Sequence, residues 1–514
     1  MGLYDYGIYQ VIKRNAKVLV GKTALISGDN NITYGQLLDH VDQLASGLVR
    51  VGLKKGDRIG VLARNSLEYV YLYGAAAKIG AIMLPVNWRL NPREVEYVIS
   101  DGKPRVLFVD SEFKPMTSSL ITKFGFIASC FAMGRAEGNF AAFGELMGDV
   151  RSPTELGSRA DDPYVIIHTA AVSGNPRGAT LSQASLLINS LQFMNYWRLT
   201  EEDCHLCMLP LFHFGALGTS LSIMQTGGTN IILPKFNPEL ALEHIQKDKV
   251  TLFGEFPPML ISLLDRASEA QYDLSSLRVV VGLDDPDTIK RFEKTTGGTF
   301  WAFYGQTETS GLVTLAPYFE RPGSSGVPVF MAEVEVVDEE GNFLKAGKTG
   351  EIVVRGPMVF KGYWNLEEDN KQTLRNGWHH TGDMGSFDSD GYLWYKGRKA
   401  EKDLIKPGGE NVYPAEVEKV ILEHPLVSEA SVIGVPDQKW GEAIKAVCVL
   451  ESGKSISESA LIEFVATRIA RFKKPKFVVF VSSLPKTGDG LIDREKVKAL
   501  YGNTSWGEGG DHEE

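Results

Sequence analysis

The sequence predicts an α/β fold with a large N-terminal domain of βαβ-layered sheets, a barrel-like β unit and a small mobile α+β C-terminal domain. Three observations support this prediction. In the first half, apolar strands alternate with segments of helical period, which is typical of parallel βαβ layers. After about residue 325, short alternating strands with glycine turns indicate an antiparallel unit. Beyond a glycine- and charge-rich stretch at 397–403, helices and strands alternate again over about 100 residues, the size of a small domain.

The elements of the first half follow from local patterns. Thr33-Tyr-Gly-Gln36 has the spacing of a capping box, and apolar residues at helical period follow it. Asp285 followed by Pro286 predicts the N-cap and first turn of a later helix. Between them we expect helices around 67–77 and 94–100, and strands at 58–63, 81–85, 106–110, 164–167 and 279–283.

The second half predicts the domain boundaries. We expect a large domain at 1–396, a hinge at 397–403, a small domain at 404–501 and a disordered acidic tail at 502–514. The expected elements are strands at 334–337, 350–355, 392–396, 427–435, 446–450 and 477–481, and helices at 414–424 and 458–471.

Composition excludes several classes of protein. A net charge of -10 without a long basic run argues against nucleic acid as a partner. Four cysteines in 514 residues cannot form a disulfide framework, which indicates a reducing compartment. Cys204-His-Leu-Cys207 leads into an apolar run, so we interpret both cysteines as core residues and not as a redox or zinc site. No targeting segment and no apolar run of about 18 residues is visible, so we expect a cytoplasmic protein without an integral membrane segment. The oligomeric state cannot be read from the sequence.

Four segments carry groups suited to nucleotide chemistry. The loop from Thr169 to Gly178 follows an apolar strand, and it is equally consistent with a phosphate-wrapping loop or a simple turn. Tyr304-Gly-Gln-Thr-Glu308 combines an aromatic face, a hydroxyl and a carboxylate that can bind Mg²⁺. Asp383 can accept two ribose hydroxyls and Arg398 can pair with phosphate oxygens, whereas His379 and His380 are interpreted as a surface turn. The fourth segment, Lys406-Pro-Gly-Gly-Glu-Asn-Val-Tyr-Pro, predicts a tight loop before a helix.

These segments, in this order over roughly residues 30 to 494, resemble the acyl-adenylate-forming (AMP-binding) enzyme superfamily, in its acyl-CoA synthetase or acid–thiol ligase branch. The resemblance implies an AMP-forming ligase that converts a carboxylic acid, ATP and coenzyme A to acyl-CoA, AMP and diphosphate through an acyl adenylate. It also implies a Mg²⁺ ion at Glu308. Amino acids are disfavoured as substrates because the segment Leu211-Phe-His-Phe-Gly-Ala216 lacks the aspartate that would bind an amino group.

The resemblance assigns a role to each matching position. The residues expected to bind ATP, AMP or coenzyme A are Thr169, Ser173, Gly174, Arg177, Tyr304, Gln306, Thr307, Asp383, Arg398, Gly408 and Gly409. The expected substrate pocket is His213, Gly282, Leu283, Asp284 and Gly305, with a core role for His213 equally open. The residues expected to act in catalysis are Thr307, Glu308, Arg398 and the hinge candidate Lys402. Asp284 in such a pocket would disfavour a dicarboxylic acid.

The main departure from the family pattern is Leu491 in Pro485-Lys-Thr-Gly-Asp-Gly-Leu-Ile-Asp-Arg494. The family normally places a lysine there, which contacts the substrate carboxylate and the α-phosphate during adenylation. Leucine offers neither charge nor donor, so adenylation is expected to be impaired. Three accounts stay open: an engineered substitution, a native subgroup that tolerates the loss or uses another cation such as Lys486 or Lys402, and a non-catalytic binder of acyl-AMP or acyl-CoA. Ala170, Ala171, Val172 and Arg177 in the loop, and the wider spacing from Arg398 to Lys402, slightly favour a natural divergent subgroup.

Overall fold

The computed structural model describes residues 5–148, 157–169, 176–398, 404–437, 439–487 and 490–502. The chain forms two compact units. The larger unit ends at Lys396, and the smaller unit begins at Gly397 and also takes in short segments from earlier in the chain.

An eight-stranded sheet forms one layer of the larger unit. Its strands lie in the order β19-β9-β8-β4-β3-β5-β6-β7, and the pairs from β8 to β7 are parallel. This arrangement confirms the βαβ pattern predicted for the first half. The bounds are β3 (Arg58–Leu62), β4 (Ile82–Pro85), β5 (Val106–Val109), β6 (Ser129–Ala132), β7 (Ala141–Ala142), β8 (Pro163–Thr169), β9 (Arg177–Ser182) and β19 (Gly362–Tyr363).

A nine-stranded sheet forms the second layer, in the order β16-β15-β14-β13-β12-β10-β11-β1-β2. The strands from β14 to β1 are parallel, and β2, β15 and β16 add antiparallel edges. The bounds are β1 (Thr23–Ser27), β2 (Asn30–Thr33), β10 (Cys204–Cys207), β11 (Thr229–Ile232), β12 (Leu252–Glu255), β13 (Val279–Gly282), β14 (Thr299–Gln306), β15 (Gly311–Pro317) and β16 (Val327–Pro328).

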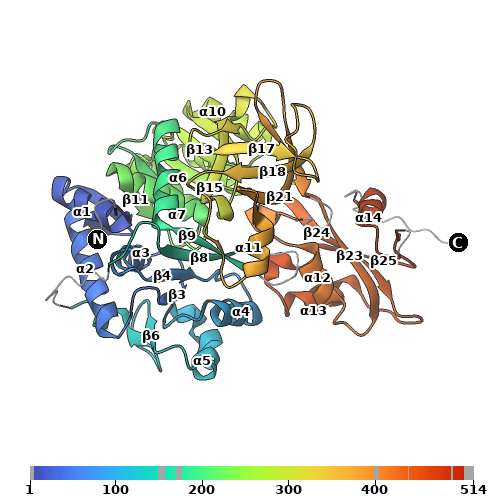
Figure 1. The fold of residues 1–514 in the computed structure, drawn as a ribbon, viewed down its shortest axis with the longest axis horizontal. Coiled ribbons are helices and arrows are strands. Elements are labelled where there is room, and N and C mark those ends of the chain that lie inside the picture. Colours follow the sequence, from blue (N-terminus) through green and yellow to red (C-terminus); the bar gives the residue numbers. More distant parts are fainter. Residues whose placement is uncertain are drawn as a thin grey trace. The chain divides into compact units, whose positions relative to one another are not determined.

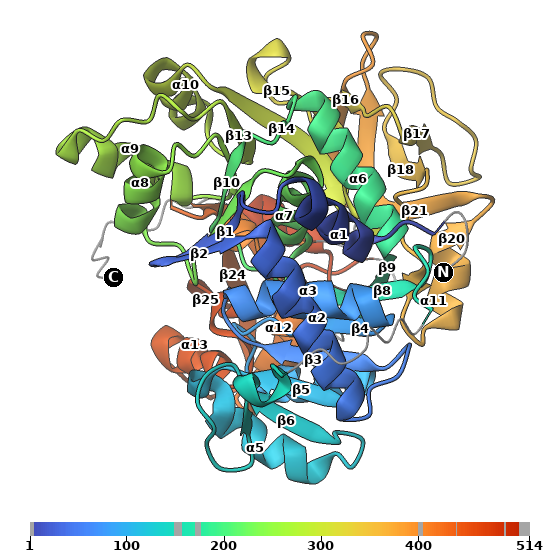
Figure 2. The same ribbon diagram turned by 90° about the vertical axis from the view of Figure 1, so that its left-hand side faces the viewer.

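Helices cover both faces of the nine-stranded sheet. In β13, Val279 and Val281 join a core shared with the eight-stranded sheet and with helices α1, α2, α3, α6 and α7, whereas Val280 packs with α8, α9 and α10. Figure 2 shows those last three helices together on one side of β13 and β10. The bounds are α1 (Ile8–Val18), α2 (Tyr34–Arg50), α3 (Leu67–Ile79), α4 (Pro92–Gly102), α5 (Lys114–Lys123), α6 (Gln183–Tyr196), α7 (Phe214–Thr226), α8 (Pro238–Lys247), α9 (Met259–Ala270) and α10 (Pro286–Thr296).

Local predictions for these helices hold in detail. Thr33 and Gln36 form the capping box at the start of α2, and Asp285 caps α10 by accepting hydrogen bonds from the amides of Asp287 and Thr288. Both cysteines of β10 are buried, which confirms their interpretation as core residues. Among the described residues, every helix is too short or too polar to cross a membrane.

The barrel-like unit that the sequence predicts takes the form of a five-stranded antiparallel sheet, with the order β17-β18-β21-β20 and with β22 paired to β21. Figure 1 shows β17, β18 and β21 side by side. Helix α11 (Glu367–Thr373) precedes β20. The strands are β17 (Glu333–Val337), β18 (Gly350–Arg355), β20 (Leu374–Arg375), β21 (Trp378–Phe387) and β22 (Leu393–Arg398). Gly397 and Arg398, expected in the hinge, continue strand β22.

The smaller unit holds a three-stranded sheet, β23-β24-β25, whose two faces pack on different helices. Ala430 and Val432 of β23 join the core under α12 and α13, whereas Ile433 and Val435 join a second core with Val497 of α14. The elements are α12 (Pro414–Ile421), β23 (Val427–Asp437), β24 (Gly441–Leu450), α13 (Glu458–Ala466), β25 (Phe477–Val481) and α14 (Arg494–Tyr501). Helix α13 ends five residues before the expected 471, at Ala466.

Candidate functional site

The carboxyl ends of four neighbouring strands bring together most of the residues that the sequence singles out in the larger unit. Strands β10, β12, β13 and β14 are parallel, so their ends lie at one edge of the sheet. Open α/β sheets bind ligands outside this edge. Here it carries His213 at the start of α7, Glu255 at the end of β12, the loop Gly282–Asp284 after β13 and the segment Gln306–Glu308 after β14.

Asp383 of β21 is the centre of a buried hydrogen-bond cluster. Its side chain is 3% exposed. The Tyr304 hydroxyl donates to its Oδ2 at 2.7 Å, and the Gln306 amide donates to the same oxygen at 2.6 Å. Tyr304 also stacks on Tyr395 with the ring centroids 6.1 Å apart. Two donors from the end of β14 therefore hold a carboxylate of a different sheet in one orientation.

Glu308 lies in the short 3₁₀ helix η3 (Thr307–Thr309) and is buried. The Tyr363 hydroxyl donates to Glu308 Oε1 at 2.8 Å, and the Thr169 hydroxyl approaches the same oxygen at 3.4 Å. Thr307 beside it is half-buried. The structure thus brings Thr169 next to Thr307 and Glu308, which lie far from it in the chain.

Arg177 begins β9 and is held by two groups. Its Nη1 lies 3.0 Å from Asp369 Oδ1 of α11, and its guanidinium sits over the Tyr363 ring at 4.1 Å from the centroid. Tyr363 therefore contacts both Arg177 and Glu308. A guanidinium is planar and suited to bind phosphate oxygens. To bind a phosphate, Arg177 would have to give up its ion pair with Asp369.

His379 and His380 are not a surface turn, and that interpretation was wrong. Both are buried in strand β21, where the ring of Phe360 packs edge-on against His379 at 5.3 Å between centroids and Glu351 lies against His380. His379 Nε2 lies 3.1 Å from Gln306 Oε1, and His380 Nδ1 lies 3.1 Å from Glu351 Oε2. His379 thereby orients the amide of Gln306, whose other end donates to Asp383.

The expected acyl residues differ in exposure. His213 is half-buried, with its ring 4.4 Å from that of Phe212. Gly305 is half-buried opposite Leu312 of β15. Leu283 is exposed, and Asp284 is half-buried with Oδ1 accepting the amide of Asp285 at 2.8 Å. Burial raises the pKa of Asp284 to about 7.

Glu255 is a residue that the sequence reasoning missed. It is fully buried at the end of β12, and neither side-chain oxygen has a hydrogen-bond partner among the described residues. Desolvation raises its pKa well above the usual value, and the charge of Asp284 raises it further. The signal available in the sequence was a lone acid ending the apolar run Val250–Gly254. Tyr363 and Asp369 were missed as well, because their contacts depend on the fold.

In the smaller unit, Arg398 donates a hydrogen bond to the Tyr413 hydroxyl. Gly408 and Gly409 lie in the turn Pro407–Gly409, where both have positive φ values of 57° and 80° that favour glycine. The Gly408 amide donates to the carbonyl of Trp440 at 3.0 Å. The loop that the sequence predicts before α12 is therefore present and tied to β24.

Leu491 is 67% exposed. Its carbonyl accepts hydrogen bonds from both the amide and the hydroxyl of Thr487, at 2.8 and 3.1 Å. The backbone turn is therefore formed, and the leucine side chain takes no part in a core. Lys486 Nζ lies 2.6 Å from Glu429 Oε1, so this candidate replacement cation is already paired.

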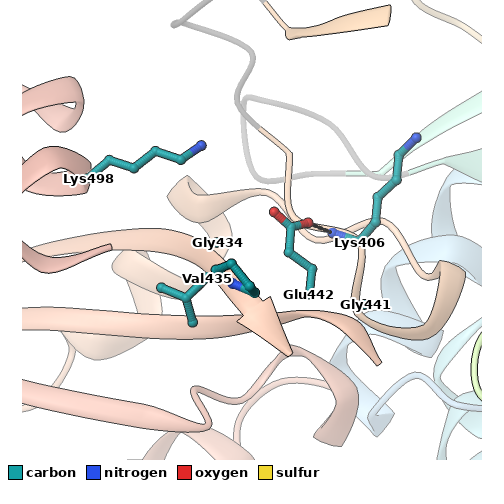
Figure 3. Close-up of a pocket in the computed structure, with 7 residues that line it drawn as sticks. Lys406, Gly434, Val435, Gly441, Glu442 and Lys498 are labelled. Carbon is teal, nitrogen blue, oxygen red and sulfur yellow. Dashed lines mark hydrogen bonds between the residues drawn. The ribbon is translucent and has the colours of Figure 1, made fainter. Parts of the chain in front are cut away.

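A surface pocket of about 460 Å³ in the smaller unit is lined by Lys406, Gly434, Val435, Pro436, Gly441, Glu442 and Lys498. Figure 3 shows Glu442 between the two lysines. Its Oε2 accepts the amide of Lys406 at 2.7 Å. The central carboxylate offsets the charge of the lysines, so the pocket is not a dedicated anion site.

Three expected site residues, Ser173, Gly174 and Lys402, lie outside the described residues. Within the described residues, no cluster of three His, Cys, Asp or Glu side chains could hold a metal ion. A magnesium ion at Glu308 would take its other ligands from phosphate oxygens and water, which is the usual arrangement for Mg²⁺ with nucleotides.

Comparison with known families places the chain. A model described as AMP-binding enzyme matches residues 12–364, and one described as AMP-binding enzyme C-terminal domain matches residues 416–491. The chain belongs to the AMP-binding enzyme family. The resemblance inferred from the motifs is thus confirmed, and so is the class of acid–thiol ligase.

Relatives in this family cover almost the whole chain. An indoleacetate–CoA ligase of Aromatoleum aromaticum is 34% identical over 95% of this chain and 97% of its own length. A feruloyl-CoA synthase of Amycolatopsis sp is 35% identical over 95% of this chain and 98% of its own. A Rhodopseudomonas palustris structure assigned as a long-chain-fatty-acid CoA ligase is 47% identical, with a TM-score of 0.75, over 77% of this chain and 100% of its own.

A double mutant of o-succinylbenzoate CoA synthetase from Bacillus subtilis, solved with a product analogue, has a TM-score of 0.85 at 28% identity. It covers 96% of this chain and 99% of its own length. The mixed α/β fold with a large N-terminal and a small C-terminal domain is therefore that of the family.

Proposed function

We propose that this chain activates a carboxylic acid with ATP as an acyl adenylate and then transfers the acyl group to coenzyme A. The observation that carries the proposal is the buried cluster around Asp383, in which Tyr304 and Gln306 donate to the same carboxylate oxygen. Because both donors bind Oδ2, the Asp383 carboxylate is held in a single orientation. A fixed carboxylate is suited to accept the two hydroxyls of a ribose.

The groups next to this cluster suit the phosphates. Glu308 supplies a carboxylate for Mg²⁺, and Thr169 and Thr307 supply hydroxyl donors near it. Arg177 supplies a cation, stacked on Tyr363. When bound, the magnesium ion would neutralise phosphate charge, which is the main requirement of attack on the α-phosphate. Tyr363 and Thr169 hold the Glu308 carboxylate in place for that role.

The acid is proposed to be aromatic. The names of the relatives include ligases for indoleacetate, ferulate and 2-succinylbenzoate, and this chain aligns with them over nearly its full length. The half-exposed edge formed by His213, Leu283 and Gly305 offers ring and apolar surface for such an acid. Coenzyme A is the proposed acceptor, with the loop at Gly408 and Gly409 as its route.

We further propose that Leu491 weakens the first half-reaction and spares the second. A cation bridging carboxylate and α-phosphate stabilises charge that develops during adenylation only, so its loss affects that step. The turn that presents residue 491 is intact, and the leucine side chain is solvent-exposed. The alternative cation Lys486 is paired with Glu429. A loss of roughly 10²–10⁴-fold is the scale for one well-placed charged group.

Two measurements test the proposal separately. ATP with a panel of aryl acids and labelled diphosphate reports adenylation through isotope exchange, and synthetic acyl-AMP with coenzyme A reports thioester formation. Thioester from acyl-AMP together with slow exchange is the expected result. Fast exchange with the native leucine would overturn the claim about residue 491 and leave the ligase assignment standing.

A second candidate function is a binder of acyl-AMP or acyl-CoA without turnover, which the exposed Leu491 favours. In that case both assays would be negative while isothermal titration detects acyl-AMP binding. Failure of acyl-AMP to bind at all would exclude both functions.

A further inference from the structure

Two acidic side chains, Glu255 and Asp284, lie near one another at the carboxyl ends of β12 and β13. Both oxygens of Glu255 and the Oδ2 atom of Asp284 are buried and lack a hydrogen-bond partner among the described residues. Glu255 is 0% exposed. Buried polar groups are normally hydrogen-bonded, and leaving a buried acceptor unsatisfied is costly. Such a pair indicates a place where a ligand supplies the missing donor.

The position of Glu255 follows from strand register. Glu255 is paired with Gly282 across β12 and β13, so it lies at the edge where those strands end. A Cβ atom on Gly282 would come within 2.5 Å of Glu255 Oε1 and 2.3 Å of its carbonyl oxygen. The carboxyl therefore uses the space that a side chain at 282 would fill, close enough to Asp284 for the two charges to interact.

The described residues around Glu255 and Asp284 supply few hydrogen-bond donors and no cation to offset the burial of these two acids. Glu255 lies on the sheet face covered by α9 and α10, in line with Phe253 and Val280. The amide of Leu260 in the first turn of α9 interacts with the carboxyl without reaching hydrogen-bond geometry. Asp285, the other charged group beside the loop, is committed to capping α10. No cation in the described residues contacts Glu255 or Asp284.

We propose that Glu255 and Asp284 together receive the far end of the acid substrate and select an acid that carries an N–H or O–H donor there. This inference rests on the proposed function, because it assumes that the acid binds at the carboxyl ends of β12 and β13. A neutral donor would satisfy an oxygen that now has no partner. A second carboxylate at the same place would be buried without a cation to pair with it and would be excluded.

The energetic scale decides whether such selection is measurable. A hydrogen bond to a charged or partly charged acceptor in a buried site changes affinity roughly ten- to hundredfold. A site built to bind a donor also rejects the analogue that lacks it more strongly than an apolar pocket rejects a missing methylene. The two acids should therefore act on specificity more than on the chemistry of adenylation.

The test uses non-hydrolysable acyl-sulfamoyl adenosines made from phenylacetic acid and from its 3- and 4-hydroxy, aminomethyl and carboxy derivatives. Their dissociation constants are measured by isothermal titration with the full chain at pH 7. We expect a hydroxy or aminomethyl compound to bind at least about tenfold more tightly than the parent, and the carboxy compounds to bind most weakly. A preference for hydroxy would identify a neutral donor, and a preference for aminomethyl a cation.

Variants separate the roles of charge and hydrogen bonding. Glu255→Met should remove the preference for the donor compounds, and Glu255→Gln should relieve the exclusion of the carboxy compounds. Asp284→Asn, at a half-exposed position, is the second variant should Glu255 variants fail to fold. Asp287→Asn, an exposed acid on α10, is the matched control and should bind like the native chain.

Two outcomes would overturn the inference. One is that parent and donor compounds bind the native chain within twofold of each other. The other is that the donor preference survives in both Glu255→Met and Asp284→Asn, in which case trapped water satisfies the pair. If no compound binds, including the parent, the proposed function itself fails, so the two failures can be told apart.

Discussion

Replacing Leu491 with lysine should accelerate acyl-adenylate formation by roughly 10²–10⁴-fold. The position is suited to the change because the side chain is 67% exposed and lies outside both cores of the smaller unit. Substitutions at such surface positions usually alter the unfolding free energy by less than about 0.5 kcal/mol. Any gain in rate would therefore report on chemistry and not on stability.

The magnitude follows from the interaction that the lysine would add. An ammonium about 4 Å from a carboxylate or phosphate oxygen contributes about 4 kcal/mol at the effective dielectric of a partly exposed site. Since about 1.4 kcal/mol corresponds to a factor of ten in rate, the midpoint of the expected gain is near a thousandfold. Lys486 does not supply this charge at present, because its ammonium is paired with Glu429 at 2.6 Å.

The assay compares the two half-reactions in three proteins. Native chain, Leu491→Lys and Leu491→Met are each tested for ATP–diphosphate exchange and for thioester formation from synthetic acyl-AMP. Methionine is the control because it lengthens the side chain without adding charge. We expect only the lysine variant to gain exchange, with all three similar in thioester formation.

Two results would refute this reasoning. Rapid exchange by the native chain, unchanged in Leu491→Lys, would show that no cation is needed at position 491. An equal gain in Leu491→Met would show that side-chain length, and not charge, limits the reaction.

Further predictions concern buried polar groups. Tyr304→Phe removes the hydrogen bond that the Tyr304 hydroxyl donates to Asp383. It should destabilise the chain by about 1–3 kcal/mol in urea unfolding and weaken ATP binding in nucleotide titration. Unchanged ATP affinity would contradict the proposed role of Asp383 in binding ribose. The raised pKa values of Glu255 and Asp284 mean that the folded native chain binds more protons than the unfolded chain, so its unfolding free energy falls as the pH rises above about 4.5. Glu255→Gln removes one of these groups, and should therefore stabilise the chain more at pH 8 than at pH 5. Thermal unfolding at both pH values checks this, and an equal effect at each would exclude the shift. Lys473→Met removes the buried ammonium that lies 2.7 Å from Glu416 Oε2 and 2.6 Å from Glu94 Oε1, and should cost about 3–5 kcal/mol in urea unfolding. Partial recovery is expected in Lys473→Met/Glu416→Gln. A loss below about 1 kcal/mol, on the scale of an exposed pair, would count against burial of this ion-paired group.

Much of the fold could be predicted because it depends on local signals. The capping box at Thr33 and Gln36, the N-cap at Asp285 and the apolar strands at 106–109 and 279–282 are each determined by a few adjacent residues. The burial of His379 was mispredicted because a polar pair beside a glycine looks like a turn. Contacts of its ring with Phe360 and Gln306 bury it, and no local pattern reports those contacts.

The candidate site shows the same division. Motif order assigned Tyr304, Glu308 and Asp383 to a common site, but the hydrogen bond between Tyr304 and Asp383 required the structure. Tyr363, which connects Arg177 to Glu308, comes from a two-residue strand that no periodicity could indicate. The hinge candidate Lys402 lies outside the described residues and stays a prediction, as do Ser173 and Gly174.

By itself, the sequence determined the family, the order of the domains and the absence of a lysine at position 491, because each depends only on which residue types occur and in what order. The tertiary structure alone decided that the side chain of Leu491 is exposed, that Tyr304 and Gln306 donate to Asp383, and that Glu255 is buried near Asp284 with no hydrogen-bond partner among the described residues. These features depend on distances between strands that are far apart in the chain. Parallel pairing of β12, β13 and β14 sets those distances, and residue order does not contain them.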